Sequence, residues 1–184
     1  MGLESALVLV AFVVVSSVFA ILSTGMFSGD ESKEALSETR SNIRLLGSVV
    51  AEDTDTDGNV DRLTFLVGND AGGEGVQLDP GKAFVRYNDY SQTVLFFRST
   101  EYSVTPLGNA NSDNLIEPGE IFKLSLLGME SNLTTMLTRC RTFAIDLITS
   151  KGAVLHIERS IPSVISKSTR LSVGFPLSCY GLGL

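Results

Sequence analysis

The stretch of sequence that decides the fold is residues 3–27, LESALVLVAFVVVSSVFAILSTGMF, which carries a single charged side chain, Glu4. About 20 apolar residues are enough for a helix to cross a bilayer, whereas strands rarely exceed about ten residues. The length of the run therefore predicts a helix, although its valine and phenylalanine content alone would suit a strand.

No lysine or arginine precedes Lys33. Secretory signal peptides and uncleaved anchors usually carry basic residues beside the apolar core. Their absence favours a chain from which a basic leader has been removed. Two interpretations of Glu4 stay open: an acid at the start of a helix at the membrane surface, or a partner for a free α-amino group.

The helical pattern continues as an amphipathic stripe, at spacings of three and four residues, formed by Leu36, Thr39, Ile43, Leu46 and Val50. We therefore expect a helix from residue 3 to about 51, on the order of 75 Å long. This divides the chain into an N-terminal region, 1–51, and an outer domain, 52–184. The outer domain is too small to cover so long a helix, so lipid or other copies of the chain must cover its apolar part.

The outer domain consists of short segments rich in Val, Leu, Phe and Thr, separated by Gly, Pro, Asn and Asp turns. This spacing predicts an antiparallel β-sandwich, which gives the chain an α+β fold class. Residues 131–139 fit either a strand or a short helix. The expected strands are 62–67, 83–87, 93–98, 102–105, 121–127, 142–148, 154–159 and 170–175.

Composition excludes several classes of function. The net charge of the 184 residues is −7, and no basic patch is visible that would bind nucleic acid. Two cysteines and one histidine exclude a cysteine-rich zinc module and most histidine-based catalytic sites. The sequence lacks the nucleophile-elbow, phosphate-loop and dinucleotide-binding motifs, so we expect no enzymatic activity.

The acidic stretch 52–61, EDTDTDGNVD, is the best candidate for a metal site. Alternating carboxylates followed by a glycine match the first half of a calcium-binding loop. Thr64 occupies the position of the usual final glutamate, and Asp61 could replace that ligand in another geometry. The sequence thus favours either a Ca²⁺ site or a solvated acidic turn, with candidate ligands Asp53, Asp55, Asp57 and Asp61.

Two further features, a sequon and a pair of cysteines, suit an exported protein, and the single histidine has its own interpretation. Asn132-Leu133-Thr134 is the only N-x-[ST] sequon and makes Asn132 a candidate glycosylation site. Cys140 and Cys179 would form either a disulfide or two buried thiols. His156 shares one face of a predicted strand with Val154 and Glu158, and we expect a surface or hydrogen-bonded histidine there.

Taken together, these residues resemble an archaellin, the subunit of the archaeal flagellum, and more broadly the type IV pilin superfamily. The resemblance begins with Gly-Leu-Glu followed by ALVLVAFVVVSSVFA and continues in the outer domain. The outer-domain motifs are DGNVDRLTFLV at 57–67, LIEPGEIFKL at 115–124, and the stretch from Gly152 to Arg159 and Pro162.

The resemblance implies an immunoglobulin-like sandwich carried on a long N-terminal helix, and a structural subunit that polymerises with itself into an extracellular filament for swimming. It also implies a prepilin-type peptidase acting on the precursor, transient residence in the membrane, and assembly by a membrane platform with a motor ATPase. An adhesion pilin and a minor, membrane-anchored stator-like component are the alternatives. In the leading interpretation Glu4 recruits subunits or neutralises a neighbour's N-terminal amine. The expected filament-core contacts are Glu4, Leu3, Leu7, Val10, Phe12, Val14 and Phe19.

Overall fold

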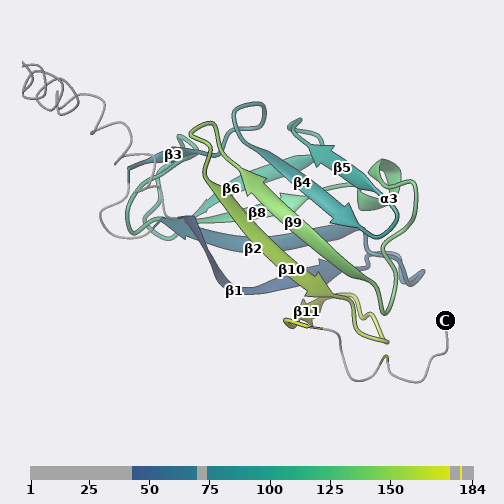
Figure 1. Cartoon of the computed structure of the whole chain (residues 1–184). Coiled ribbons are helices and arrows are strands. Elements are labelled where there is room, and N and C mark those ends of the chain that lie inside the picture. The colour runs from purple at the N-terminus through teal and green to yellow at the C-terminus, as the bar shows by residue number, and fades with distance from the viewer. Residues whose placement is uncertain (1–42, 70–73, 175–178, 180–184) are drawn as a thin grey trace, which may run out of the picture. The chain divides into compact units, whose positions relative to one another are not determined.

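The computed structural model describes residues 43–69, 74–174 and 179, all within the second of the chain's two units, Glu38–Leu184. These residues form a two-layer antiparallel β-sandwich with one short helix, α3 (Met129–Asn132), and a small sheet made of β3 (Val76–Gln77) and β7 (Leu115–Ile116). Figure 1 shows the four-stranded layer in front of the five-stranded layer. The predicted antiparallel sandwich is therefore confirmed.

The five-stranded sheet contains the first and the last strand of the domain as neighbours. Every pair in it is antiparallel. Its order is β11 (Thr169–Leu171), β1 (Ile43–Glu52), β2 (Arg62–Asn69), β8 (Ile121–Leu126) and β6 (Tyr102–Leu107).

The four-stranded sheet is also antiparallel throughout, and its edge strands are β10 and β5. Apolar residues alternate along it, as expected for a sheet with one buried face. In β10, Ile157 is buried, whereas Val154, His156 and Glu158 are exposed, which confirms the predicted alternation. The order is β10 (Val154–Ser160), β9 (Thr142–Ile148), β4 (Phe84–Asp89) and β5 (Thr93–Phe96).

One hydrophobic core fills the space between the two sheets. Phe65 and Leu124 enter it from the five-stranded sheet, and Tyr87 and Ile145 from the four-stranded sheet. The Tyr102 hydroxyl donates to the backbone oxygens of Ala83 (2.6 Å) and Leu78 (3.2 Å), so its polar tip is satisfied inside the core.

The prediction of a helix reaching residue 51 is wrong for its last part, because Ile43–Glu52 is the strand β1. Paired apolar residues, Leu45-Leu46 and Val49-Val50, fit a helical stripe and a strand equally well. The structure favours the strand because Val49 and Ala51 can enter the core beside β2. The pairing register of β1 with β2 shifts between Leu46 and Val50. Gly47 lies in this irregularity with φ 75°, a value that favours glycine.

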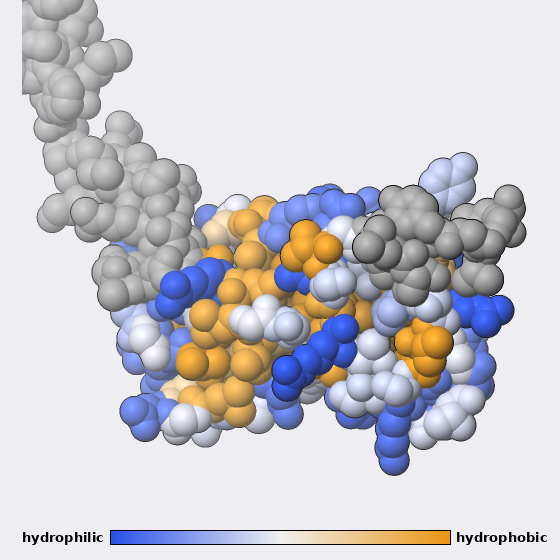
Figure 2. Space-filling model, turned by 90° about the horizontal axis from the view of Figure 1, so that it is seen from below, coloured by the Kyte–Doolittle hydropathy of each residue, from blue (hydrophilic) through white to orange (hydrophobic). Residues whose placement is uncertain are grey.

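β11 pairs only with Val49–Ala51, so the first half of β1 has a strand on one side only. Ile43 and Leu45 in this half are partly buried against the core. Seen from below, the domain shows apolar surface interrupted by charged side chains (Figure 2). Across the described residues, no helix has the length and apolar character needed to cross a membrane. The apolar segment 3–27 lies outside those residues.

Candidate functional site

The structure brings the predicted calcium ligands together in the loop between β1 and β2. Carboxylate oxygens of Asp53, Asp55 and Asp61 lie within 4.8 Å of one another. Asp53 is buried, and its two oxygens accept hydrogen bonds from the backbone N–H groups of Thr56 (2.7 Å) and Gly58 (3.0 Å). Asp61 accepts bonds from the Thr54 backbone N–H and hydroxyl. The loop therefore orients its acids through backbone donors.

A second acidic group contains a residue that the sequence did not reveal. Glu130, at the start of α3, places a carboxylate oxygen within 4.8 Å of those of Asp55 and Asp57. Burial raises the pKa of Glu130, and the negative charge of Asp57 raises it further, whereas the Asn59 backbone N–H lowers the pKa of Asp57. A divalent cation would relieve the repulsion among these carboxylates. Only the folded position of α3 brings Glu130 here, because more than 70 residues separate it from Asp57.

The outer face of the four-stranded sheet carries a row of charged residues from three strands. Arg86, Asp146 and His156 are aligned by the registers of β4, β9 and β10. Arg86 Nε and Nη2 donate to Asp146 Oδ2 at 3.0 and 2.7 Å, and His156 Nδ1 lies 2.6 Å from Asp146 Oδ1. The predicted hydrogen-bonded surface histidine is thus confirmed, with Asp146 as its partner.

Asp146 is only 6% exposed. Burial by itself would raise the pKa of Asp146, but the hydrogen bonds from His156 and Arg86 outweigh it, and the pKa is lowered. The carboxylate is therefore held in its charged form by its two cross-strand neighbours.

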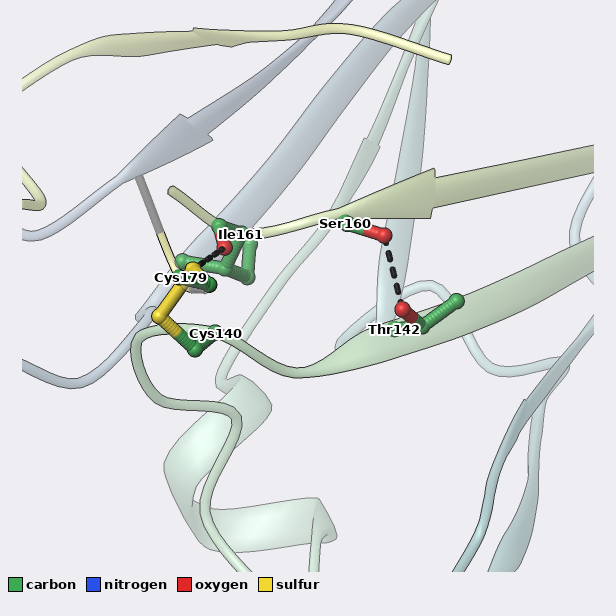
Figure 3. Close-up of a disulfide and its surroundings, with 5 residues drawn as sticks. All are labelled: Cys140, Thr142, Ser160, Ile161 and Cys179. Carbon is green, nitrogen blue, oxygen red and sulfur yellow. Dashed lines mark hydrogen bonds between the residues drawn. A yellow bond between two sulfur atoms is a disulfide. The ribbon is translucent and has the colours of Figure 1, made fainter. Parts of the chain in front are cut away.

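A disulfide joins Cys140 and Cys179, which are 39 residues apart in the sequence. Figure 3 shows the bond beside Ile161 and next to the hydroxyl pair of Thr142 and Ser160, whose oxygens are 2.7 Å apart. The Cys140 backbone N–H donates to the Ile161 oxygen at 3.0 Å. The bridge thus ties Cys179 to the junctions where β9 begins and β10 ends.

The sequon asparagine, Asn132, is the last residue of α3 and is partly exposed. Its Nδ2 donates to the backbone oxygens of Gly128 (2.8 Å) and Leu127 (3.3 Å). A sugar on Nδ2 would leave one N–H, so one of these two bonds can persist after modification. Residues 131–139, which the sequence left undecided, form the end of this helix and an irregular segment.

The predicted filament-core contacts lie outside the described residues. They are Leu3, Glu4, Leu7, Val10, Phe12, Val14 and Phe19. Their role in the filament core stays a prediction.

Comparison with known proteins identifies the family. The model of the archaeal-type flagellin family matches residues 1–159. The chain is similar to a probable flagellin of Aeropyrum pernix, at 29% identity over 94% of this chain and 96% of that protein. Its fold is similar to the subunit of the Methanospirillum hungatei archaeal flagellum (TM-score 0.58, 22% identity, 94% of this chain and 99% of the other). It is also similar to a Methanocaldococcus jannaschii archaeal flagellin (TM-score 0.59, 15% identity, 71% and 96%).

The family match covers both the apolar N-terminal segment and most of the β-domain. It ends at residue 159, one residue before the end of β10. Neither part alone accounts for it. The chain belongs to the archaeal-type flagellin family.

Proposed function

We propose that this chain is a structural subunit of the archaeal flagellum and polymerises with itself into a surface filament. The observation that carries the proposal is the family match over residues 1–159, which joins an apolar segment to a β-sandwich in one chain. Polymerisation of this kind draws on burial of apolar surface, about 25 cal/mol per Å² removed from water, and needs no catalytic group in the subunit.

The N-terminal segment is the proposed filament core. Its apolar run carries one charge, Glu4, and copies of it would cover one another in the filament. We propose a helix that ends before Ile43, since β1 begins there. Before assembly, the same segment would hold the subunit in the membrane, after a prepilin-type peptidase has processed the precursor. A membrane platform and a motor ATPase would then insert the subunit into the filament.

Deletion of the gene, combined with electron microscopy of the cell surface, tests the function. We expect cells without filaments and without swimming, both restored by the full chain. Cells that swim normally but no longer attach to surfaces would favour an adhesion pilin instead. A protein found in the membrane at few copies, with no effect on filament number, would favour a stator-like component.

The acidic loop between β1 and β2 supports a second proposal, a structural calcium ion. Support comes from the convergence of Asp53, Asp55 and Asp61 and from the nearby Glu130. If calcium exceeds its dissociation constant about tenfold, it stabilises the folded domain by about 1.4 kcal/mol. We expect the full chain to melt at a higher temperature in millimolar calcium than in chelator.

The double variant Asp55→Asn, Asp57→Asn should lose this difference. The matched control is Asp113→Asn, an exposed acid outside the loop, which should keep it. Equal melting of the wild-type chain with and without chelator would remove the calcium proposal.

Asn132 remains the proposed glycosylation site, supported by its partial exposure at the end of α3. The intact mass of subunits from purified filaments should exceed the polypeptide mass. Subunits of the Asn132→Gln variant should have the mass of the polypeptide alone.

A further inference from the structure

A row of apolar side chains crosses the outer face of the four-stranded sheet. The strand registers align Phe84 of β4 with Ile148 of β9, and Ile148 with Val154 of β10. These positions are two residues from Arg86, Asp146 and His156, which are joined by hydrogen bonds outside the sandwich, so both rows face outward.

At the β5 edge of the sheet, two further apolar side chains lie beside this row. Leu95 of β5 pairs with Arg86 and so faces outward, and Phe97 follows Leu95 by two residues. Phe84, Leu95 and Phe97 line one shallow hollow of about 260 Å³. We call Phe84, Leu95, Phe97, Ile148 and Val154 the apolar band.

The apolar band is exposed where a solvated sheet face would normally be polar. Val154 is 55% exposed, Leu95 48% and Phe97 44%. On the other side of the Arg86 row, the next row of outward-facing residues is mostly polar, as is usual for a solvated sheet face. It consists of Thr93, Asn88, Ala144 and Glu158, and its three polar residues are exposed. This exposed apolar surface runs across all four strands, so it is a surface that another molecule can cover.

The border of the apolar band is electrically neutral. Each basic residue beside it is paired with a carboxylate of the same chain: Lys82 with Asp79 (3.4 Å), Arg98 with Glu101 (3.8 Å), Lys151 with Glu74 (2.6 Å) and Arg86 with Asp146 (2.7 Å). Arg98 also lies over the Phe97 ring, 5.1 Å from its centroid. Two copies of a chain with net charge −7 repel one another, so a neutral, apolar face is where they can meet.

The size of the apolar band also bears on its occupant. Four strands spaced about 4.8 Å apart give a width of about 15 Å, and one residue row with Leu95 beside it gives an area on the order of 100 Å². A stable interface in solution buries about 800 Å² on each partner. The band is too small to hold a dimer alone, but it can add to an association already held by another contact.

We propose that the apolar band is a contact surface for a second copy of this chain in the filament. This rests on the proposed function, in which the N-terminal segments supply the main association. The contact is heterologous, because a polymer with two different ends joins different surfaces of successive subunits. Free subunits therefore do not pair through the band.

The test compares one substitution at two positions on the same strand and the same face. Leu95→Glu places a charge in the apolar band, and Thr93→Glu places it outside the band on β5. Val154→Glu repeats the test at the opposite edge strand. The readouts are filament number by electron microscopy, subunit amount in the membrane fraction, and the melting temperature of purified filaments.

We expect Leu95→Glu and Val154→Glu to reduce filament number at least about tenfold, since a buried, unpaired charge at every subunit contact costs more than the 1.4 kcal/mol equivalent to that factor. Subunit amount should stay normal, and Thr93→Glu should assemble like the wild type. If Leu95→Glu does not accumulate, Leu95→Ser should give filaments that melt at lower temperature than Thr93→Ser.

Wild-type filament number and melting in both Leu95→Glu and Val154→Glu would overturn the proposal. Normal filaments with a loss of surface attachment would also overturn it, since the occupant would then be another partner. A wild-type chain that forms no filament would instead refute the proposed function, so the two failures are distinguishable.

Discussion

Removal of the disulfide should lower the stability of the β-domain by about 4 kcal/mol. The bridge closes a loop of 39 residues between Cys140 and Cys179, and the chain-entropy model gives this cost for a loop of about that length. In a chain of this size the loss corresponds to a fall in melting temperature on the order of 10 °C. The measurement compares the full chain with the Cys140→Ser, Cys179→Ser variant in mild detergent.

The wild-type chain treated with reductant is the matched control, because it loses the same bond without a change of sequence. Its melting temperature should fall to that of the double variant. A loss below about 1 kcal/mol in both would show that the segment around Cys179 is held in place without the bridge.

The Asp146→Asn substitution should lower the free energy of unfolding by about 2 kcal/mol at neutral pH. The substitution keeps the size of the side chain but turns one acceptor into a donor that faces Arg86 or His156, and hydrogen bonds to charged groups contribute about 1.5–3 kcal/mol. Arg86 is about half exposed, so water recovers part of the loss.

The pH dependence identifies the charge as the cause. The folded-state pKa of Asp146 is lowered, so its contribution is fully present above the unfolded pKa of about 3.9 and is lost as the pH falls through the folded value. The stability difference between wild type and Asp146→Asn should therefore shrink below about pH 4. Glu158→Gln, on the same sheet face, should show no such difference, and a constant Asp146→Asn effect down to about pH 3 would contradict this account.

Most of the β-domain follows from the sequence because its strands are short and bounded by turns. The expected strands at 142–148 and 154–159 match β9 and β10 to within one residue. β1 could not be predicted, because adjacent apolar pairs hid the alternation and Gly47 lies in an irregularity. The two-residue strands β3 and β7 carry too little pattern to be recognised.

The candidate sites could be predicted where their residues are close in sequence, and not where the fold brings distant residues together. Acids adjacent in sequence, Asp53 to Asp61, could be grouped from the sequence, because a short loop keeps them together. Glu130 and the partner of His156 could not, since each depends on the register or packing of elements far apart in the chain. The cysteine pairing stayed open for the same reason.

The position of β1 between β2 and β11 has a mechanical consequence. β1 begins at Ile43 and is held by seven register pairs with β2 and three with β11. A pull along the axis of β1 loads these ladders in parallel, as shear, rather than opening them one bond at a time. A domain built in this way resists tension applied through its first strand, which suits a subunit of a filament used for swimming.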